Sequence, residues 1–438
     1  METEEISMDR RIFLKSAAPA VAAPAIRLNS QSPNEKMGVA MIGVGTRGIY
    51  LLERVQEAPN VEIRHICDLY DGNLARAAKT AFNKKAVTSK DWEKAVESKD
   101  IDAVVIATPD FWHATMAVRA AQLKKHVYVE KGLCRTLEEA KAIRKAVRDN
   151  KVTLQLGHDI NSTPEVAKAR EIFKSGRLGK TPLIRTYIDR TNPWPEWQFY
   201  TAYNINQPPA DATPQSVDWE RFQANSSKKV EFDRERFFRW RCWWEYGTGI
   251  AGDLMSHAWD TINGIAAMGI PETVTAQGDL YFWKQDRDVP DMWHVFFDYP
   301  KQELLVTFDC TFHNRHHGTA NFLFGRDATM EMGRGKLRVY GAEWKPEFYD
   351  KMRAARKKYE AAGLDPDIAE VEPDFVLKKG ELEISNHIRN WIDCIRSGEV
   401  PRCGMQRAWE EAVTIVMAVE SHFRERKVKW DPVNEQII

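Results

Sequence analysis

Three ionisable side chains, Lys131, Asp253 and His257, are of the types that exchange protons with a hydroxyl group. Asp253 and His257 are four residues apart, so on a helix they share one face. An imidazole can act as a general base because its reference pKa lies near neutral pH, and Asp253 can orient either that ring or a substrate hydroxyl. The set suits oxidation of a carbinol, in which a base takes the hydroxyl proton while hydride leaves the carbon. Taken singly, each residue equally suits a structural role.

A glycine-rich segment predicts a dinucleotide-binding site. Gly43, Gly45 and Gly48 form the pattern GxGxxG, which follows a buried strand and opens a helix. The first glycine allows a tight turn, the second lets the backbone approach a pyrophosphate, and the third lets the helix pack closely on the strand. The helix N-terminus, at Thr46 and Arg47, supplies amides and the positive end of a dipole for the phosphates.

An acidic residue at the end of the next strand indicates which dinucleotide binds. Asp68 stands twenty residues after Gly48. A carboxylate at this place accepts hydrogen bonds from ribose hydroxyls and repels a 2′-phosphate, so the expected cofactor is NAD, with NADP less favoured. Arg47 could partly offset this preference.

The framework around these residues begins with alternating strands and helices over 37–157. The segment 103–107 is fully apolar, as in the interior of a parallel sheet. Strands separated by helices predict βαβ units and a doubly wound parallel sheet, which is an NAD-binding Rossmann domain. The expected strands are 38–43, 61–68, 103–107, 126–130 and 152–156, and helices are expected from the glycine motif to about residue 58 and over 73–82.

Residues 158–438 show a different pattern and predict an α+β substrate domain. The segment 190–245 is irregular and rich in Pro, Trp and Arg, and strands then follow in series with short turns, which favours a largely antiparallel sheet with closing C-terminal helices. The predicted fold class is therefore α/β, with an N-terminal Rossmann sheet and a C-terminal α+β domain. The expected strands are 273–283, 292–299, 304–313, 319–324 and 329–332, and the expected helices are 253–268, 351–362, 385–396 and 407–424.

Residues 1–36 predict a signal and a linker rather than folded structure. Arg10 and Arg11 form a twin-arginine pattern, an Ala-rich apolar run follows over 16–25, and Ala23-Pro24-Ala25 suits cleavage. The run is too short to span a bilayer, so no membrane insertion of the mature chain is expected. Twin-arginine export carries folded proteins, so we expect the periplasm. The alternative is a disordered basic tail, which would leave the protein in the cytoplasm.

Charge and cysteine spacing give no sign of several other classes of protein. Lys+Arg and Asp+Glu number 63 each, so net charge does not point to nucleic acid or an anionic membrane as partner. The six cysteines show no CxxC pair and no zinc-ligand spacing, and the pair His316-His317 has no acid or cysteine at metal-ligand spacing. No metal is expected.

Several further motifs resemble those of the Gfo/Idh/MocA oxidoreductases. Ala107-Thr108-Pro109 followed by His113, together with Glu130-Lys131, is similar to the signature of the nucleotide domain. The resemblance covers nearly everything after residue 36, and it implies an NAD-dependent enzyme acting on a hydroxyl of a sugar or glycoside, with Lys131 polarising the reacting oxygen. Three further segments resemble the substrate domain of exported, sugar-acting members. They are the run Trp240 to Gly249, the pattern Gly252-Asp253-x-x-x-His257-x-x-Asp260, and the segment His387 to Gly398.

The resemblance extends the expected cofactor site to Thr108, Pro109, His113, Glu130 and Lys131. His113 could brace the helix that follows Pro109 near the nicotinamide, and a purely structural role suits it equally. One departure concerns Gly132, since the family usually has proline after this lysine. A cis bond before glycine costs about 2.5–4 kcal/mol, so the backbone geometry at Lys131 is left open.

Three further residues are candidates for substrate contact. His158 follows the last Rossmann strand, where the two domains should meet at a crevice. Arg241 and Trp244 could hold a polyol by charge-assisted hydrogen bonding and stacking, and packing in a core is the alternative for the tryptophan. Asp253 and His257 complete the expected substrate site.

Three functions are compatible with these residues. The first is an NAD-dependent sugar or glycoside dehydrogenase. The second is a redox-neutral glycosidase, lyase or epimerase, in which a transient keto-sugar permits elimination and the cofactor returns to its starting state. The third is a non-catalytic sugar or nucleotide sensor, against which the joint presence of Lys131, Asp253 and His257 argues. A homo-oligomer is compatible with the sequence, which names neither the sugar nor the oxidised carbon.

Overall fold

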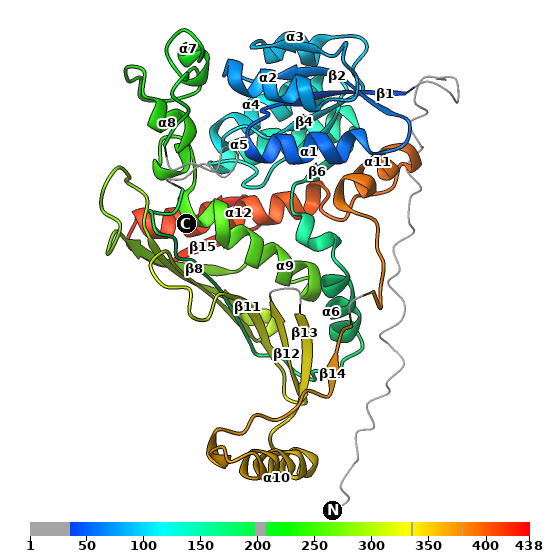
Figure 1. Ribbon diagram of the computed structural model, residues 1–438, viewed down its shortest axis with the longest axis vertical. Helices are drawn as coiled ribbons and strands as arrows, with labels where there is room; N and C mark the ends of the chain where they lie inside the picture. Colours follow the sequence, from blue (N-terminus) through cyan, green and yellow to red (C-terminus); the bar gives the residue numbers. More distant parts are fainter. Residues whose placement is uncertain (1–35, 198–206, 334–335, 379) are drawn as a thin grey trace, which may run out of the picture.

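The N-terminal domain is built on a six-stranded parallel sheet in the order β3-β2-β1-β4-β5-β6, which confirms the predicted Rossmann domain. The computed structural model describes residues 36–197, 207–333, 336–378 and 380–438 (Figure 1). The predicted signal segment lies outside the described residues, apart from Lys36. The strands are β1 Met37–Ile42, β2 Val61–Cys67, β3 Val87–Ser89, β4 Ala103–Ile106, β5 His126–Val129 and β6 Leu154–Leu156.

Helices cover both faces of this sheet, because its central strands are apolar on both sides. On one face, α1 and α2 pack together with α11, which returns from the C-terminal part of the chain. On the other face lie α3, α4 and α5. The bounds are α1 Thr46–Gln56, α2 Asp71–Thr80, α3 Trp92–Glu97, α4 Asp110–Gln122, α5 Leu137–Asn150 and α11 His387–Ser397.

The second domain is a ten-stranded sheet in the order β14-β13-β12-β11-β7-β10-β9-β8-β15-β16. All its pairs are antiparallel except β7 with β10, so the prediction of a largely antiparallel sheet is confirmed. Its strands are β7 Leu183–Asp189, β8 Thr273–Asp279, β9 Met292–Tyr299, β10 Leu304–Thr311, β11 Thr319–Phe324, β12 Ala328–Gly333, β13 Lys336–Gly341, β14 Phe375–Val376, β15 Val428–Asp431 and β16 Gln436–Ile437.

Alternating side chains decide which face of this large sheet is buried. In β9, Trp293, Val295 and Phe297 are buried, whereas His294 and Phe296 between them are exposed. The buried face packs against α9 and α12, which lie between the two sheets (Figure 1). Helix α10 projects from the far end of the sheet and has no buried residue. The remaining helices are α6 Pro164–Lys174, α7 Trp219–Phe222, α8 Arg234–Phe238, α9 Ser256–Ala266, α10 Pro346–Ala361 and α12 Met405–Phe423.

Several elements differ from the sequence expectation, among them the unexpected strands β3, β7 and β13 to β16 and the unexpected helix α6. The strand Leu183–Asp189 was not anticipated, because its sequence LIRTYID has neither a continuous apolar run nor a strict alternation of apolar and polar residues. The helix expected over 253–268 begins instead with a π-helical turn, Ala251–Met255, and continues as α9. π-Helical turns occur frequently at functional sites. In the described parts of the chain, every helix is too short or too polar to cross a bilayer.

Candidate active site

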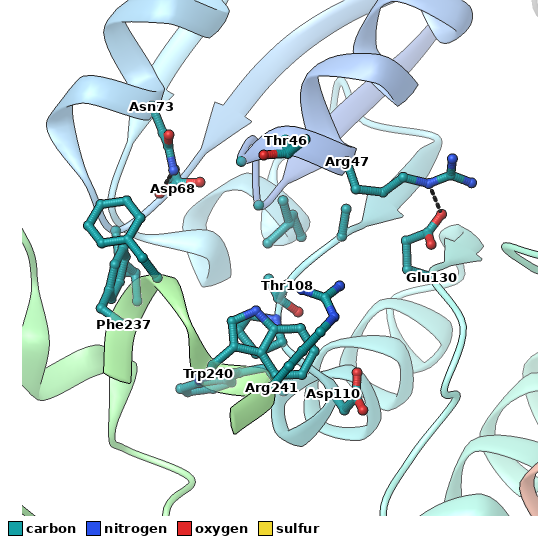
Figure 2. A pocket seen from close by; sticks show the side chains of 18 of the residues that line it. Thr46, Arg47, Asp68, Asn73, Thr108, Asp110, Glu130, Phe237, Trp240 and Arg241 are labelled. Atoms are coloured by element: carbon teal, nitrogen blue, oxygen red, sulfur yellow. Dashed lines mark hydrogen bonds and ion pairs between the residues drawn. The ribbon is translucent and has the colours of Figure 1, made fainter. Parts of the chain in front are cut away.

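A cavity of about 860 Å³ runs along the carboxyl ends of the Rossmann strands and is closed from the other side by the substrate domain (Figure 2). Residues that directly follow β1, β2, β4 and β5 line one wall, as is usual for ligand sites in open parallel sheets. The segment around Arg239, Trp240 and Arg241 forms part of the opposite wall. The cavity therefore joins the predicted cofactor site to the predicted substrate site.

The glycine motif has the geometry needed for a dinucleotide phosphate. Gly43 has φ +82°, and a Cβ there would lie 2.7 Å from the oxygen of Ala107. A Cβ on Gly48 would lie 2.0 Å from the oxygen of Gly43, so only glycine lets α1 sit this close to β1. Gly45 faces open space, with Asn73 Nδ2 at 3.9 Å as the one atom near its Cβ position. The residues present therefore fit a bound dinucleotide.

The N-terminus of α1 is free to bind an anion. Gly45 makes no side-chain cap, and the first turn of α1 contains no acidic residue. Thr46 and Arg47 line the cavity beside it. Arg47 Nε donates to Glu130 Oε1 at 2.8 Å, and its Nη2 donates to Asp159 at 3.1 Å. Arg47 is thus held on the opposite side of the cavity from Asp68 (Figure 2), so the expected offset of NAD preference by Arg47 is not supported by its position.

Asp68 lies at the end of β2 and lines the cavity. Its Oδ2 accepts from the amide of Val44 at 2.8 Å, and its Oδ1 accepts from Tyr70 at 3.0 Å and from Asn73 Nδ2 at 3.1 Å. Burial raises the pKa of Asp68, although these bonds and Arg76 oppose the shift. Arg76, which was not predicted from the sequence, also lines this end of the cavity. Arg76 is three residues after Asn73, so on a helix the two side chains share one face, and this spacing was the sequence signal that could have indicated Arg76.

At the end of β4, Thr108 and Pro109 line the cavity as expected. His113 does not line it. Its two ring nitrogens lie 2.8 Å from the oxygen of Gly132 and 2.9 Å from the oxygen of Thr108, so His113 braces two cavity loops instead of contacting a ligand. Asp110, a residue missed from the sequence, lines the cavity, accepts from Thr248 at 3.2 Å, and has a pKa raised by burial.

Asp253 is the point on which the charged groups of the site converge. Lys131 Nζ donates to its main-chain oxygen at 2.8 Å and pairs with its carboxylate. Arg241 Nε donates to Oδ1 at 3.0 Å, and Trp197 Nε1 donates to Oδ2 at 2.8 Å. Burial opposes ionisation, but Lys131 and two arginines, Arg241 and Arg190, outweigh it and hold the pKa of Asp253 well below its usual range. Asp253 is therefore a carboxylate that positions cations.

His257 lies in the first turn of α9 and lines the cavity close to Lys131 and Asp253. Its Nδ1 is buried and has no hydrogen-bond partner among the described residues. The expectation that Asp253 orients this imidazole is therefore corrected, because the bonds of Asp253 go to Lys131, Arg241 and Trp197. Burial, followed by the charges of Lys131 and His158, holds the pKa of His257 well below its usual range. An uncharged imidazole at neutral pH suits a general base.

Two residues expected to contact substrate lie outside the cavity. His158 is 1% exposed and packs behind His257. Trp244 stacks with His422 and contacts Phe423, because the segment after Cys242 turns away toward α12. Arg241, by contrast, lines the cavity and stacks over Trp240 at 4.2 Å. No sequence signal distinguished Trp240 from Trp244.

The backbone after Lys131 needs no special geometry. The described residues contain no cis peptide bond. A Cβ at Gly132 would make ordinary contacts, the nearest at 3.4 Å from Asp110 Oδ2. In the same parts of the chain, no three His, Cys, Asp or Glu side chains are grouped as metal ligands.

Two family models match the chain. That of the oxidoreductase family with NAD-binding Rossmann fold matches residues 37–158, and that of the GFO/IDH/MocA C-terminal domain matches residues 216–342. The chain belongs to the Gfo/Idh/MocA oxidoreductases. Membership in the family confirms the predicted resemblance and the NAD-binding type of its first domain.

Relatives of this Gfo/Idh/MocA protein include levoglucosan dehydrogenase of Pseudarthrobacter phenanthrenivorans, which is 31% identical over 38% of this chain and 43% of its own length. An alpha-N-acetylgalactosaminidase of Shewanella oneidensis is 28% identical over 40% of this chain and 44% of its own length. Each match thus spans less than half of the relative. A solved levoglucosan dehydrogenase in complex with NADH and levoglucosan shares the fold, with a TM-score of 0.62 at 20% identity, covering 90% of this chain and 99% of that one.

Proposed function

We propose that this protein is an NAD-dependent oxidoreductase that acts on a hydroxyl group of a sugar or glycoside. The observation that carries the proposal is the meeting of Lys131, Asp253 and His257 in one cavity with the glycine motif. These residues come from both domains, and the cofactor and substrate ends of the cavity are continuous. A non-catalytic sensor would not need an uncharged imidazole beside a lysine held by a carboxylate.

Each residue has a role that its contacts support. The glycine motif, Thr46 and Asp68 would hold the dinucleotide, and bound NAD would supply the hydride acceptor. His257 would take the hydroxyl proton, since its imidazole is uncharged at neutral pH. Lys131 would stabilise negative charge on the reacting oxygen, held in place by Asp253. The substrate loses a hydride from carbon and a proton from oxygen, which leaves a carbonyl group.

The class of substrate follows from the far wall of the cavity. Trp197, Trp240 and Arg241 line this wall, and aromatic rings together with a guanidinium suit the apolar faces and hydroxyl groups of a sugar ring. The levoglucosan dehydrogenase relative acts on an anhydrosugar according to its name, which is consistent with this class. We therefore infer a carbohydrate substrate.

A second candidate function is redox-neutral cleavage of a glycoside through a keto-sugar. It is favoured by Arg190, Trp197 and Arg241, which line the cavity around Asp253 and add charged and aromatic groups to its substrate end beyond Lys131 and His257. A relative named as an alpha-N-acetylgalactosaminidase also supports it. Epimerisation fits the same residues.

A panel of sugars and glycosides tests both candidates. Purified protein is incubated with NAD and each compound, and absorbance of reduced nicotinamide is read together with product analysis. Accumulation of reduced cofactor and a keto-sugar supports the dehydrogenase. Release of a free sugar without net reduction of cofactor supports the glycosidase. Absence of any product across the panel contradicts both.

We also propose export through the twin-arginine route, on the basis of Arg10, Arg11 and the following Ala-rich run. Cell fractionation of the full chain tests this. A homo-oligomer is proposed as well, and light scattering of the purified protein tests it. Neither proposal affects the assignment of the cavity.

A further inference from the structure

A buried pair of ionisable groups lies directly behind the cavity. Nε2 of His158 and Oε2 of Glu411 are 2.6 Å apart, and the two side chains are 1% and 0% exposed. His158 follows β6 of the Rossmann domain, whereas Glu411 belongs to α12. Neither residue lines the cavity. Burying a carboxylate completely raises the free energy of the folded state unless the charge is paired, so the burial of Glu411 beside His158 suggests a functional role for the pair.

The contact of the pair with His257 suggests that reason. The rings of His158 and His257 meet edge to face, with centroids 5.1 Å apart and an interplanar angle of 83°. Nδ1 of His257 is buried without a hydrogen-bond partner in the described part of the chain. No hydrogen bond therefore fixes this imidazole from behind, and packing and charge must do so.

We propose that His158 and Glu411 form a positioning pair that holds His257 in place and keeps its imidazole uncharged, ready to accept a proton from substrate. That His257 accepts a proton from a substrate hydroxyl rests on the proposed function. The pair itself touches neither substrate nor cofactor, so both of its members act through His257.

The electrostatics of the pair agree with this role. Burial raises the pKa of Glu411. Burial opposes protonation of His158, but Glu411 and Asp260 outweigh it and raise the pKa of His158. Both shifts keep one proton inside the pair, which titrates as a unit. His257 contacts the histidine of the pair. The positive charge on His158 therefore disfavours protonation of His257 and lowers its pKa.

Other charged groups around His257 also affect its protonation, and the charge of Lys131 has a larger effect than that of His158. Lys131 disfavours protonation of His257 and Asp253 favours it, and these two groups form an ion pair with each other, so their effects on His257 oppose one another. Arg190, after β7, adds a further positive charge. The ionisable groups that face the pair include Lys131 after β5, Cys134 before α5, Asp260 in α9, His387 in α11, Cys403 before α12 and Arg407 in α12 itself.

The first test needs no substrate. The imidazole groups of the purified full chain are labelled with 13C, and each histidine is titrated by NMR, with His257→Gln used to assign the signal. In the wild type, the His257 signal should titrate below the ordinary range of an imidazole. In Glu411→Gln the carboxylate is lost, His158 releases its proton more easily, and His257 should titrate at a higher pH than in the wild type.

The second test follows kcat/KM against pH once a substrate is in hand. The acidic limb of the profile should move to higher pH in Glu411→Gln and return toward the wild-type position in Glu411→Asp, which keeps the charge. Tyr299→Phe is the matched control. It removes a hydroxyl that accepts a hydrogen bond of 3.0 Å from Trp259 on the same helix α9 and donates one of 3.1 Å to the main-chain oxygen of Gly269. No charge changes, so the acidic limb of this variant should stay in place.

The outcomes separate the possible roles of the pair. If Glu411→Gln lowers activity but its acidic limb coincides with those of the wild type and Tyr299→Phe, the pair is only structural and the proposal is overturned. If Glu411→Gln does not fold, the wild-type titration decides, and a His257 signal in or above the ordinary imidazole range overturns the proposal. A protein without sugar turnover contradicts the proposed function but leaves this titration valid.

Discussion

The ammonium group of Lys131 donates a hydrogen bond of 2.8 Å to the main-chain oxygen of Asp253, although the two residues are 122 positions apart in the chain. Lys131 follows β5 of the Rossmann domain, and Asp253 lies in the π-helical turn before α9. One contact therefore fixes the lysine and joins the two domains at the cavity. A relative displacement of the domains would separate Lys131 from the residues with which it is expected to act.

Replacing this lysine should impair the reaction more than cofactor binding. In Lys131→Met, the reacting oxygen loses its positive partner, and kcat should fall by about 10²–10³-fold, as on loss of one preorganised donor to a developing oxyanion. The dissociation constant of NAD should stay within a few-fold of the wild type. Steady-state kinetics with a turned-over sugar and a binding titration provide the two values. Near-wild-type kcat would contradict the role of Lys131.

Loss of the imidazole should be more severe. His257→Ala should lower turnover by about 10²–10⁴-fold, because no other uncharged base lines that part of the cavity among the described residues. In the wild type, activity should persist below the usual pKa of an imidazole, since the pKa of His257 is lowered and the base must be unprotonated. His422→Ala is a suitable control, because His422 packs against Trp244 outside the cavity. A parallel loss of NAD binding in His257→Ala would argue for a structural role.

The choice between NAD and NADP should depend on Asp68. In Asp68→Ala, the repulsion of a 2′-phosphate disappears while Arg76 remains at the same end of the cavity, so relative affinity for NADP should rise. Asp68 also binds the amide of Val44 and the amide group of Asn73, so affinity for both cofactors should fall somewhat. Asn73→Ala controls for that second effect. An unchanged ratio of the dissociation constants of NAD and NADP would show that Asp68 does not discriminate between the two adenine riboses.

The sequence predicted the features that depend on local pattern. The GxGxxG spacing, the apolar strands of the Rossmann domain and the series of strands from β8 to β12 each arise from residues close together in the chain, and the structure contains them with shifted ends. The strand Leu183–Asp189 escaped because its place between β10 and β11 depends on partners far along the chain. The packing of α11 on the Rossmann sheet beside α1 was not predictable for the same reason, because its partners lie far away in the chain.

The site was predictable only in part, for a related reason. Residue type identified Lys131, Asp253 and His257, but it could not show that Asp253 bonds to Lys131, Arg241 and Trp197 and not to His257. No feature of the sequence indicated a role for Glu411, a buried glutamate in α12. Its role depends on His158, which lies beside it in the structure but far away in the chain. Among neighbouring tryptophans, Trp240 and Trp244 differ only in the direction that the backbone takes between them.

The proposed export should depend on the two arginines near the start of the chain. Replacing Arg10 and Arg11 with lysine should trap the precursor in the cytoplasm, because the twin-arginine pattern is what the export route reads. Immunoblotting of periplasmic and cytoplasmic fractions measures this. Replacement of Arg27 with lysine, which lies after the Ala-rich run, is the matched control. A periplasmic fraction unchanged by the double replacement would refute the route.

The proposed export and the dinucleotide site together lead to a prediction about the cofactor. Outside the cytoplasm no pool of NAD is expected to replace a spent molecule, so an exported enzyme that released reduced cofactor would turn over once. The protein should therefore leave the cytoplasm folded around NAD and return it to its starting state in each cycle. Hydrolysis or elimination of a glycoside, epimerisation, and paired oxidation and reduction of two sugars all meet this condition.

The test is to purify the protein without added cofactor and to read bound nicotinamide by absorbance. Glycosides are then supplied without free NAD, and product is counted per protein molecule. Many turnovers are expected, and Gly45→Val, which places a side chain in the space that Gly45 leaves open beside the N-terminus of α1, should remove both bound cofactor and turnover. Strict dependence on stoichiometric free NAD, with reduced cofactor accumulating, would reject retention and assign the protein to the dehydrogenases that exchange their cofactor in each cycle.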